Sequence, residues 1–113
     1  MSRFSITSHK GVNITFKNGW QVSVQWGPGN YCERKEDNYD SPKNSEFWSS
    51  NDAEIAVWSR KGQKTREFVE LESDVVRGWC TTDEVAQVIH KVSTAKSALT
   101  NKQMTKRLSK IWK

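Results

Sequence analysis

The first 26 residues alternate apolar and polar side chains with a period of two, and this pattern constrains the fold more than any other feature. From Phe4 to Trp26, every large apolar side chain stands at an even-numbered position. Such alternation is typical of antiparallel strands that bury one face. The pattern predicts strands sharing a single apolar surface, formed by Phe4, Ile6, Val12, Ile14, Phe16, Trp20, Val22, Val24 and Trp26.

The shared face fixes the length of the second turn. A two-residue loop of Asn18 and Gly19 would place Phe16 and Trp20 on opposite faces of the sheet. A three-residue loop over 17–19 pairs these two residues, with Gly19 in the left-handed conformation of a G1 bulge. We therefore predict the longer loop, with Phe16 opposite Trp20, Ile14 opposite Val22 and Val12 opposite Val24.

The same reasoning applies to the first turn. A three-residue loop over 9–11 also keeps the apolar side chains on one face. It predicts that Ser8 pairs with Val12, Ile6 with Ile14, and Phe4 with Phe16. Residues 1–26 are therefore expected to form a three-stranded meander.

The remaining strands follow a long non-periodic stretch. Residues 52–71 predict a hairpin whose register the pattern leaves open, with Ile55 and Val57 facing one side and Ala56 and Trp58 the other. The run VVRGWC then predicts one more short strand. We expect a curved antiparallel sheet of four to six strands.

Two segments near the C-terminus have helical periodicity. Thr81 with Glu84 three residues later predicts a capping box at the start of the first helix. Its apolar stripe is expected to pack on the sheet. Thr100 with Gln103 predicts the start of a second, basic helix. The first stripe consists of Val85, Val88, Ile89 and Val92, and the second of Met104, Leu108, Ile111 and Trp112.

The overall prediction is an α+β fold, in which one helix covers the sheet and a basic helix ends the chain. Residues 1–93 are expected to form a single domain with a long loop at 27–51. Residues 94–113 form a basic amphipathic helix, which belongs to the same domain or acts as an oligomerisation arm.

Charge is concentrated in the last twenty residues. Residues 94–113 carry six basic and no acidic side chains, so the net charge of +5 leaves −1 for residues 1–93 (5 − 6). Basic amphipathic helices bind nucleic acid, associate with another subunit, or pack on their own domain. The nucleic-acid hypothesis uses Lys102, Lys106, Arg107 and Lys110, and the oligomer hypothesis uses Met104, Leu108, Ile111 and Trp112.

The loop at 27–51 is the main candidate for a binding site, because long loops in compact domains are usually functional. Its aromatic side chains can stack on a ring, and its basic side chains and glycine backbone can meet a phosphate. An alternative is a flap that covers the sheet, since the loop holds more acidic than basic residues. The predicted ligand-binding residues are Trp26, Gly27, Gly29, Asn30, Tyr31, Arg34, Lys35, Tyr39, Trp48 and Trp58.

Other functional classes lack support in the sequence. The chain has no GxSxG, HExxH, P-loop or CxxC motif, so we expect no enzymatic activity. The two histidines fit no metal pattern, and no cofactor is expected. Cys32 and Cys80 are expected to be reduced thiols, with one disulfide as the alternative. No apolar run suggests a membrane span, and Trp79 is expected to pack beneath the helix cap.

Three blocks carry a resemblance to a known group of proteins. NGWQVSVQWGPGNYC (18–32), DAEIAVW (52–58) and VRGWCTTDEVAQVI (76–89) resemble small hypothetical proteins encoded by tailed bacteriophages, over residues 11–93. The resemblance implies an accessory protein in the cytoplasm of a bacterial host, and it carries over no functional residue. We expect it to capture a small anionic, nucleotide-like ligand such as a defence signal. The alternatives are nucleic-acid binding or inhibition of a host protein.

Overall fold

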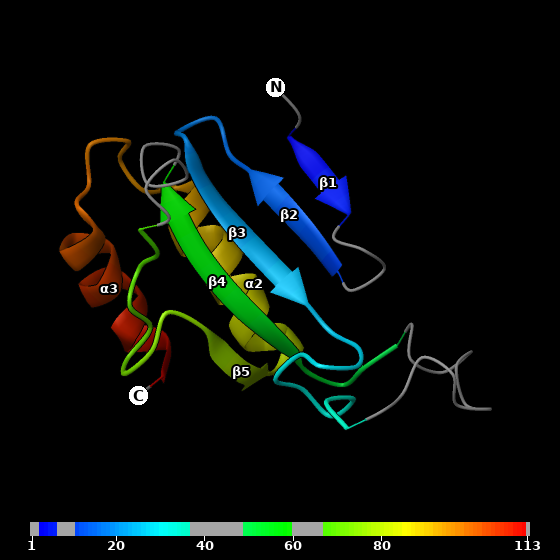
Figure 1. Cartoon of the computed structure of the whole chain (residues 1–113). Helices are drawn as coiled ribbons and strands as arrows, with labels where there is room; N and C mark the ends of the chain where they lie inside the picture. Colours follow the sequence, from blue (N-terminus) through cyan, green and yellow to red (C-terminus); the bar gives the residue numbers. More distant parts are fainter. Residues whose placement is uncertain (1–2, 7–10, 37–48, 60–66, 113) are drawn as a thin grey trace.

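The computed structural model describes residues 3–6, 11–36, 49–59 and 67–112. It shows an α+β fold built on a curved five-stranded antiparallel sheet with strand order β1-β2-β3-β4-β5 (Figure 1). The predicted fold class is therefore confirmed. The elements are β1 (Phe4–Ile6), β2 (Gly11–Thr15), β3 (Trp20–Gln25), β4 (Ala53–Ser59), β5 (Arg77–Cys80), α2 (Thr82–Ser93), α3 (Asn101–Ser109) and the 3₁₀ helix η2 (Lys110–Trp112).

The β2–β3 hairpin has the predicted register. Val12 lies opposite Val24, and Ile14 lies opposite Val22. The Phe16 amide donates to the Trp20 carbonyl at 2.9 Å, and Gly19 adopts the expected positive φ of 90°. The three-residue loop is thus confirmed, and it places the apolar side chains of both strands on the same face.

The β1–β2 pairing differs from the prediction by two residues. Phe4 lies opposite Ile14 and Ile6 opposite Val12, where we predicted Phe16 and Ile14 as their partners. A shift of two residues leaves every side chain on its own face, so alternation alone cannot distinguish the two registers. The predicted loop includes residues 9 and 10, which lie outside the described part of the chain.

Helix α2 packs across the central strands and forms the core with them. Its capping box is present as predicted, with the Glu84 amide donating to Thr81 Oγ1 at 3.1 Å and the Thr81 amide donating to Glu84 Oε1 at 2.9 Å. In Figure 1 the helix lies behind β3 and β4, and we call that side the rear face of the sheet. Core side chains there include Val22, Val24, Ile55, Val57, Val88 and Val92.

The rear face is not covered as far as β1. The side chains of Phe4 and Ile6 are 72% and 80% exposed, although their partners Ile14 and Val12 are half-buried. Helix α2 contacts β3 and β4 and leaves β1 uncovered (Figure 1). The expectation that the whole meander is half-buried is therefore wrong for its first strand.

Asn18, at the centre of the β2–β3 loop, closes the C-terminal end of α2. Its Nδ2 donates to the carbonyls of Val92 and Ala95, both at 2.8 Å, while its Oδ1 accepts the Trp20 amide at 3.0 Å. The Val92 carbonyl in the last turn also accepts the Ala95 amide at 3.2 Å, and the Ala95 carbonyl lies just beyond the helix end, so Asn18 adds a second donor to the first and supplies a donor to the second. The hairpin and the helix are thereby joined through one residue.

Helix α3 packs on the same core as α2. The capping box predicted at Thr100 and Gln103 is present. Met104, Leu108 and Ile111 are buried in the core of their own chain, so the interface that we predicted for them is not available to a second copy. Trp112 is half-buried, with the Arg77 guanidinium 4.0 Å from the centroid of its ring. Among the described residues, no helix is long and apolar enough to cross a membrane.

The Asn18 bonds give a direct test of the fold. We expect Asn18→Ala to lower the free energy of unfolding by about 1–3 kcal/mol, because it removes the side-chain donor to the Ala95 carbonyl and the acceptor of the Trp20 amide. Urea denaturation followed by circular dichroism measures the change. Lys17→Ala, at the exposed neighbouring position, is the control and should be close to neutral. Equal stability of the two variants would contradict the capping role of Asn18.

Candidate functional site

The structure distributes the predicted ligand-binding residues over different parts of the molecule. Trp26 is half-buried and packs against the core on the rear face. Trp58 belongs to the opposite, front face, where its ring meets Phe68 edge-on at 5.3 Å. Tyr39 and Trp48 lie outside the described residues. The remaining predicted residues lie together on residues 27–36, the part of the loop that the structure describes.

The Gly27–Pro28–Gly29 corner forms a compact turn. Gly27 and Gly29 have positive φ values of 110° and 86°, which glycine adopts without strain. The Gly29 amide donates to the Lys35 carbonyl at 3.1 Å, and the Asn30 amide donates to the Gly27 carbonyl at 3.2 Å. These amides are therefore used within the loop, which corrects our expectation that the Gly27–Asn30 backbone meets a phosphate. Asn30 itself is buried.

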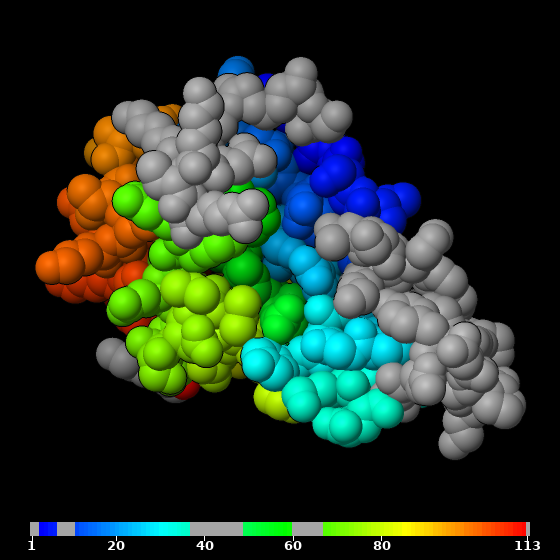
Figure 2. Space-filling view, viewed as in Figure 1, coloured from blue at the N-terminus to red at the C-terminus, as the bar shows by residue number. Residues whose placement is uncertain are grey.

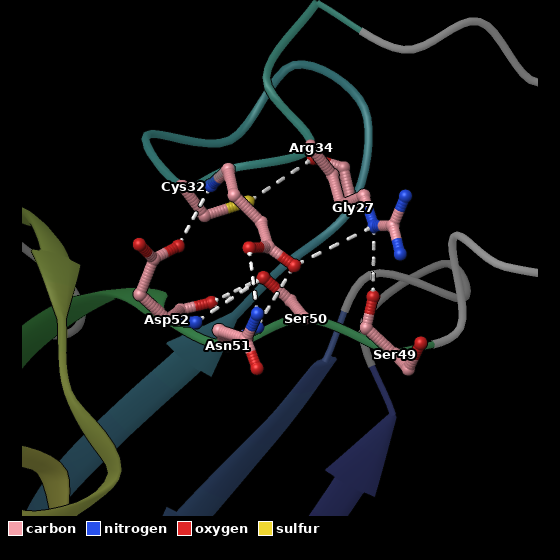
Figure 3. Close-up of polar contacts among 8 residues, drawn as sticks. Gly27, Cys32, Arg34, Ser49, Ser50, Asn51 and Asp52 are labelled. Carbon is pink, nitrogen blue, oxygen red and sulfur yellow. Dashed lines mark hydrogen bonds and ion pairs between the residues drawn. The ribbon is translucent and has the colours of Figure 1, made fainter.

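A set of hydrogen bonds joins this loop to the segment that enters β4 (Figure 3). The Glu33 carboxylate accepts the Asn51 amide at 3.0 Å and Asn51 Nδ2 at 3.1 Å. In return the Glu33 amide donates to Asp52 Oδ1 at 2.7 Å. Arg34 Nε donates to the Ser49 carbonyl at 3.0 Å. The carboxylates of Glu33 and Asp52 thus have a structural role, and we call this set of bonds the loop brace.

The braced loop presents an aromatic pair with strand β5. The rings of Tyr31 and Trp79 are stacked, with centroids 5.8 Å apart and an interplanar angle of 21°. Tyr31 is 41% exposed and Trp79 is 54% exposed. The Lys35 ammonium lies 5.8 Å from the centroid of the Tyr31 ring, at the outer limit of a cation–π contact. We call Tyr31, Trp79 and Lys35 the corner surface.

The backbone holds Trp79 in this exposed position. The Trp79 amide donates to the Tyr31 carbonyl at 2.8 Å, and Trp79 has a φ of 50°, which is rare for a bulky side chain. A Cβ atom at Gly78 would lie 2.5 Å from Tyr31 Cβ, so glycine is needed for the close approach of the two segments. Left-handed conformations of this kind cluster at binding sites, where surrounding structure supports them.

Sequence reasoning missed Trp79, which we expected to pack beneath the helix cap. The structure instead directs its ring outward, while its neighbour Cys80 is buried. Strand alternation was the available signal, because a buried Cys80 places Trp79 on the other side of the strand.

A pocket of about 280 Å³ lies on the inner side of β5. Trp26, Asp52, Cys80 and Thr82 contribute to its lining together with apolar core residues. Burial raises the pKa of the Cys80 thiol to about 12, and the nearby carboxylates of Glu84 and Asp52 act in the same direction. A protonated thiol is a poor nucleophile. Cys32 is also buried, and both cysteines are free thiols.

The basic residues of the C-terminal segment separate into two groups. Lys102, Lys106 and Lys110 are exposed and stand four residues apart along α3 and η2. Arg107 is held on the protein by bonds from its Nε to the Lys91 carbonyl at 2.8 Å and from Nη2 to Thr94 Oγ1 at 3.0 Å. Three of the four residues of the nucleic-acid hypothesis therefore form one exposed basic row.

No protein-family model, curated protein or solved structure matches the chain. Within the described ranges, no group of three or more His, Cys, Asp or Glu side chains is arranged to hold a metal ion.

The raised pKa of Cys80 predicts a loss of stability at alkaline pH. Above pH 9 the unfolded chain releases the thiol proton, whereas the folded chain keeps it up to about pH 12. The folded state then binds more protons, so the free energy of unfolding falls by roughly 1.4 kcal/mol per pH unit in this range. Urea denaturation of the wild type and Cys80→Ala between pH 8 and about pH 10 measures the difference in slope. Parallel slopes would show that Cys80 does not titrate as described.

Proposed function

We propose that this protein is a non-enzymatic binding protein that captures a small anionic ligand with an aromatic ring, such as a nucleotide, on the corner surface. The observation that carries the proposal is the exposed Tyr31–Trp79 stack beside Lys35. Exposing two aromatic rings to water has no benefit for the isolated fold. A flat ring that covers Trp79 removes apolar surface from water and extends the stack.

The charges near the corner surface also favour an anionic group. Arg34 Nε lies 3.9 Å from Glu33 Oε1, so part of the negative charge of the described loop is already paired with a positive one. Lys35 forms an ion pair with Glu36 at 3.1 Å, but the Glu36 side chain is 89% exposed. Exposed pairs contribute about 0–1 kcal/mol, so a phosphate can replace Glu36 as the partner of Lys35.

The size of the surface sets the expected affinity. Stacking of a base on an aromatic side chain contributes about 1–3 kcal/mol, and a charge-assisted hydrogen bond about 1.5–3 kcal/mol. Together, at about 2.5–6 kcal/mol, they correspond to a dissociation constant between roughly 0.05 mM and roughly 10 mM for the described residues alone. Tyr39 and Trp48 remain candidates for additional contacts.

The proposal extends to a biological setting. The similarity of three sequence blocks to small proteins of tailed bacteriophages supports an accessory role in the cytoplasm of a bacterial host. In that setting, capture of a nucleotide signal used in host defence is the function that best suits a small binding protein. Inhibition of a host protein is the alternative in the same setting.

Isothermal titration with mono-, di- and cyclic nucleotides tests the proposal. We expect heat with at least one nucleotide, and we expect Trp79→Ala to weaken that binding at least tenfold because the stacking surface is lost. Lys35→Gln should weaken binding of the nucleotide more than binding of the corresponding nucleoside, whereas the matched change Lys17→Gln should leave both unchanged. A panel without heat, or full affinity in Trp79→Ala, would exclude the corner surface.

A second candidate function is nucleic-acid binding by the basic row Lys102, Lys106 and Lys110. The supporting observation is that all three lysines are exposed on a segment whose apolar residues fill the core. Deletion of this segment cannot test the idea, because it would remove Met104 and Leu108 from the core. Surface substitution leaves the core intact.

The basic row predicts a salt-dependent interaction. If it binds duplex DNA, the triple variant Lys102→Gln, Lys106→Gln, Lys110→Gln should make the negative slope of log K against log salt shallower by roughly 3, since each phosphate contact contributes about −0.9 to that slope. Fluorescence anisotropy with a labelled duplex at several salt concentrations measures this slope. The triple Lys→Arg variant keeps the charge and serves as the control. Identical slopes for the Gln and Arg variants would rule out the row as the binding surface.

A further inference from the structure

The front face of the sheet contains a recess that is separate from the corner surface. On this face Asn13, Ser23 and Ala56 lie side by side in one row across β2, β3 and β4. A hollow of about 240 Å³ lies over this row. In Figure 2, which views the same side as Figure 1, the blue and green atoms of the sheet are set back between the yellow-green segment after residue 67 and the cyan loop.

Small side chains in the middle row produce the hollow. Ser23 and Ala56 extend only a short distance from the sheet, whereas the neighbouring row on one side contains Trp58 and that on the other contains Gln25 opposite Glu54. Phe68 lies against Trp58, held there by a backbone bridge between the two residues. We call this set of residues the front-face recess: Asn13, Ser23, Gln25, Glu54, Ala56, Trp58 and Phe68.

The floor of the recess has hydrogen-bonding groups suited to a ligand that carries hydroxyls. Asn13 Oδ1 is enclosed and has no hydrogen-bond partner within the described part of the chain. An enclosed acceptor without a partner costs about 1–3 kcal/mol, which a ligand O–H recovers when the Asn13 side chain turns toward the hollow. Gln25 Nε2 donates to Ser23 Oγ at 2.9 Å, so the Ser23 hydroxyl has its own proton to donate to a ligand oxygen.

The walls of the recess restrict the class of ligand further. Trp58 and Phe68 meet at an interplanar angle of 76° and supply an apolar side wall. Among the described lining residues, Glu54 is the only charged one, and its carboxylate disfavours a phosphate. A neutral ring with apolar C–H groups and several hydroxyls matches both the wall and the floor.

We infer that the front-face recess binds a neutral polyhydroxylated ring, which is the chemistry of a free saccharide or of the ribose of a nucleoside. The inference is independent of the corner surface. The recess is proposed to bind a neutral ligand and the corner surface an anionic one, and the two sites share no residue. Its volume suits a single ring. Asn13 and Ser23 hold the hydroxyls, and Trp58 and Phe68 cover the apolar edge.

Nuclear magnetic resonance with the ¹⁵N-labelled full chain tests the inference. The probes are D-glucose, D-galactose, N-acetyl-D-glucosamine, D-ribose, adenosine and uridine, each up to about 50 mM, which covers the millimolar range of single-ring binding. We expect saturable shifts of the side-chain amide signals of Asn13 and Gln25 and of the indole signal of Trp58. A response to hexoses identifies a saccharide site, and a response to ribose and the nucleosides alone identifies a ribose site.

Four variants separate binding at the recess from folding and from the corner surface. Ala56→Leu fills the hollow and should weaken binding at least tenfold, while Ala86→Leu, at an exposed position of α2, should not change it. Asn13→Leu keeps the size of the side chain and removes the unpartnered oxygen, so it should lower affinity without lowering the urea midpoint. Trp79→Ala should leave these shifts unchanged, which distinguishes the recess from the corner surface. Absence of saturable shifts with every probe, or shifts that persist in Ala56→Leu, overturns the inference.

Discussion

The three-residue loop between β2 and β3 is the constraint on which the rest of the structure depends. Its length keeps Phe16 opposite Trp20 and so directs every apolar side chain of both strands to the rear face. The same loop carries Asn18 to the end of α2, where it bonds the Val92 and Ala95 carbonyls. One turn therefore determines both the apolar face of the sheet and the point at which the helix ends on it.

Much of this fold could be predicted because local patterns and tertiary packing agree. Alternation gave the faces of β2, β3 and β4, and the capping boxes gave the starts of α2 and α3. The register of β1 could not be predicted, because a shift of two residues changes no face. The exposure of Phe4 also follows from how far α2 reaches across the sheet, which depends on packing and not on the residues of β1.

The candidate site was less predictable because it combines segments distant in sequence. The sequence predicted the corner at Gly27 and Gly29. It did not predict that the Gly29 and Asn30 amides donate to carbonyls within the same loop. The hydrogen bond between the Asn51 amide and the Glu33 carboxylate joins two segments that are distant in sequence, so only the fold shows it. The contact between Tyr31 and Trp79 requires Gly78 to lie beneath Tyr31, a proximity that no local pattern encodes. The sequence therefore indicates which side chains could bind a ligand, but it does not indicate which of them the fold brings together.

The loop brace has a consequence for how this protein can change during evolution. Arg34 is hydrogen-bonded to Ser49, and Glu33 is hydrogen-bonded to Asn51. These bonds hold the two ends of the segment between residues 34 and 49 next to each other. For a flexible connection between fixed ends, doubling the length costs only about 0.6 kcal/mol. Insertions, deletions or a grafted peptide between these two anchors should therefore leave the sheet and its helices undisturbed. The fold can acquire new specificities at that place while retaining the same supporting framework.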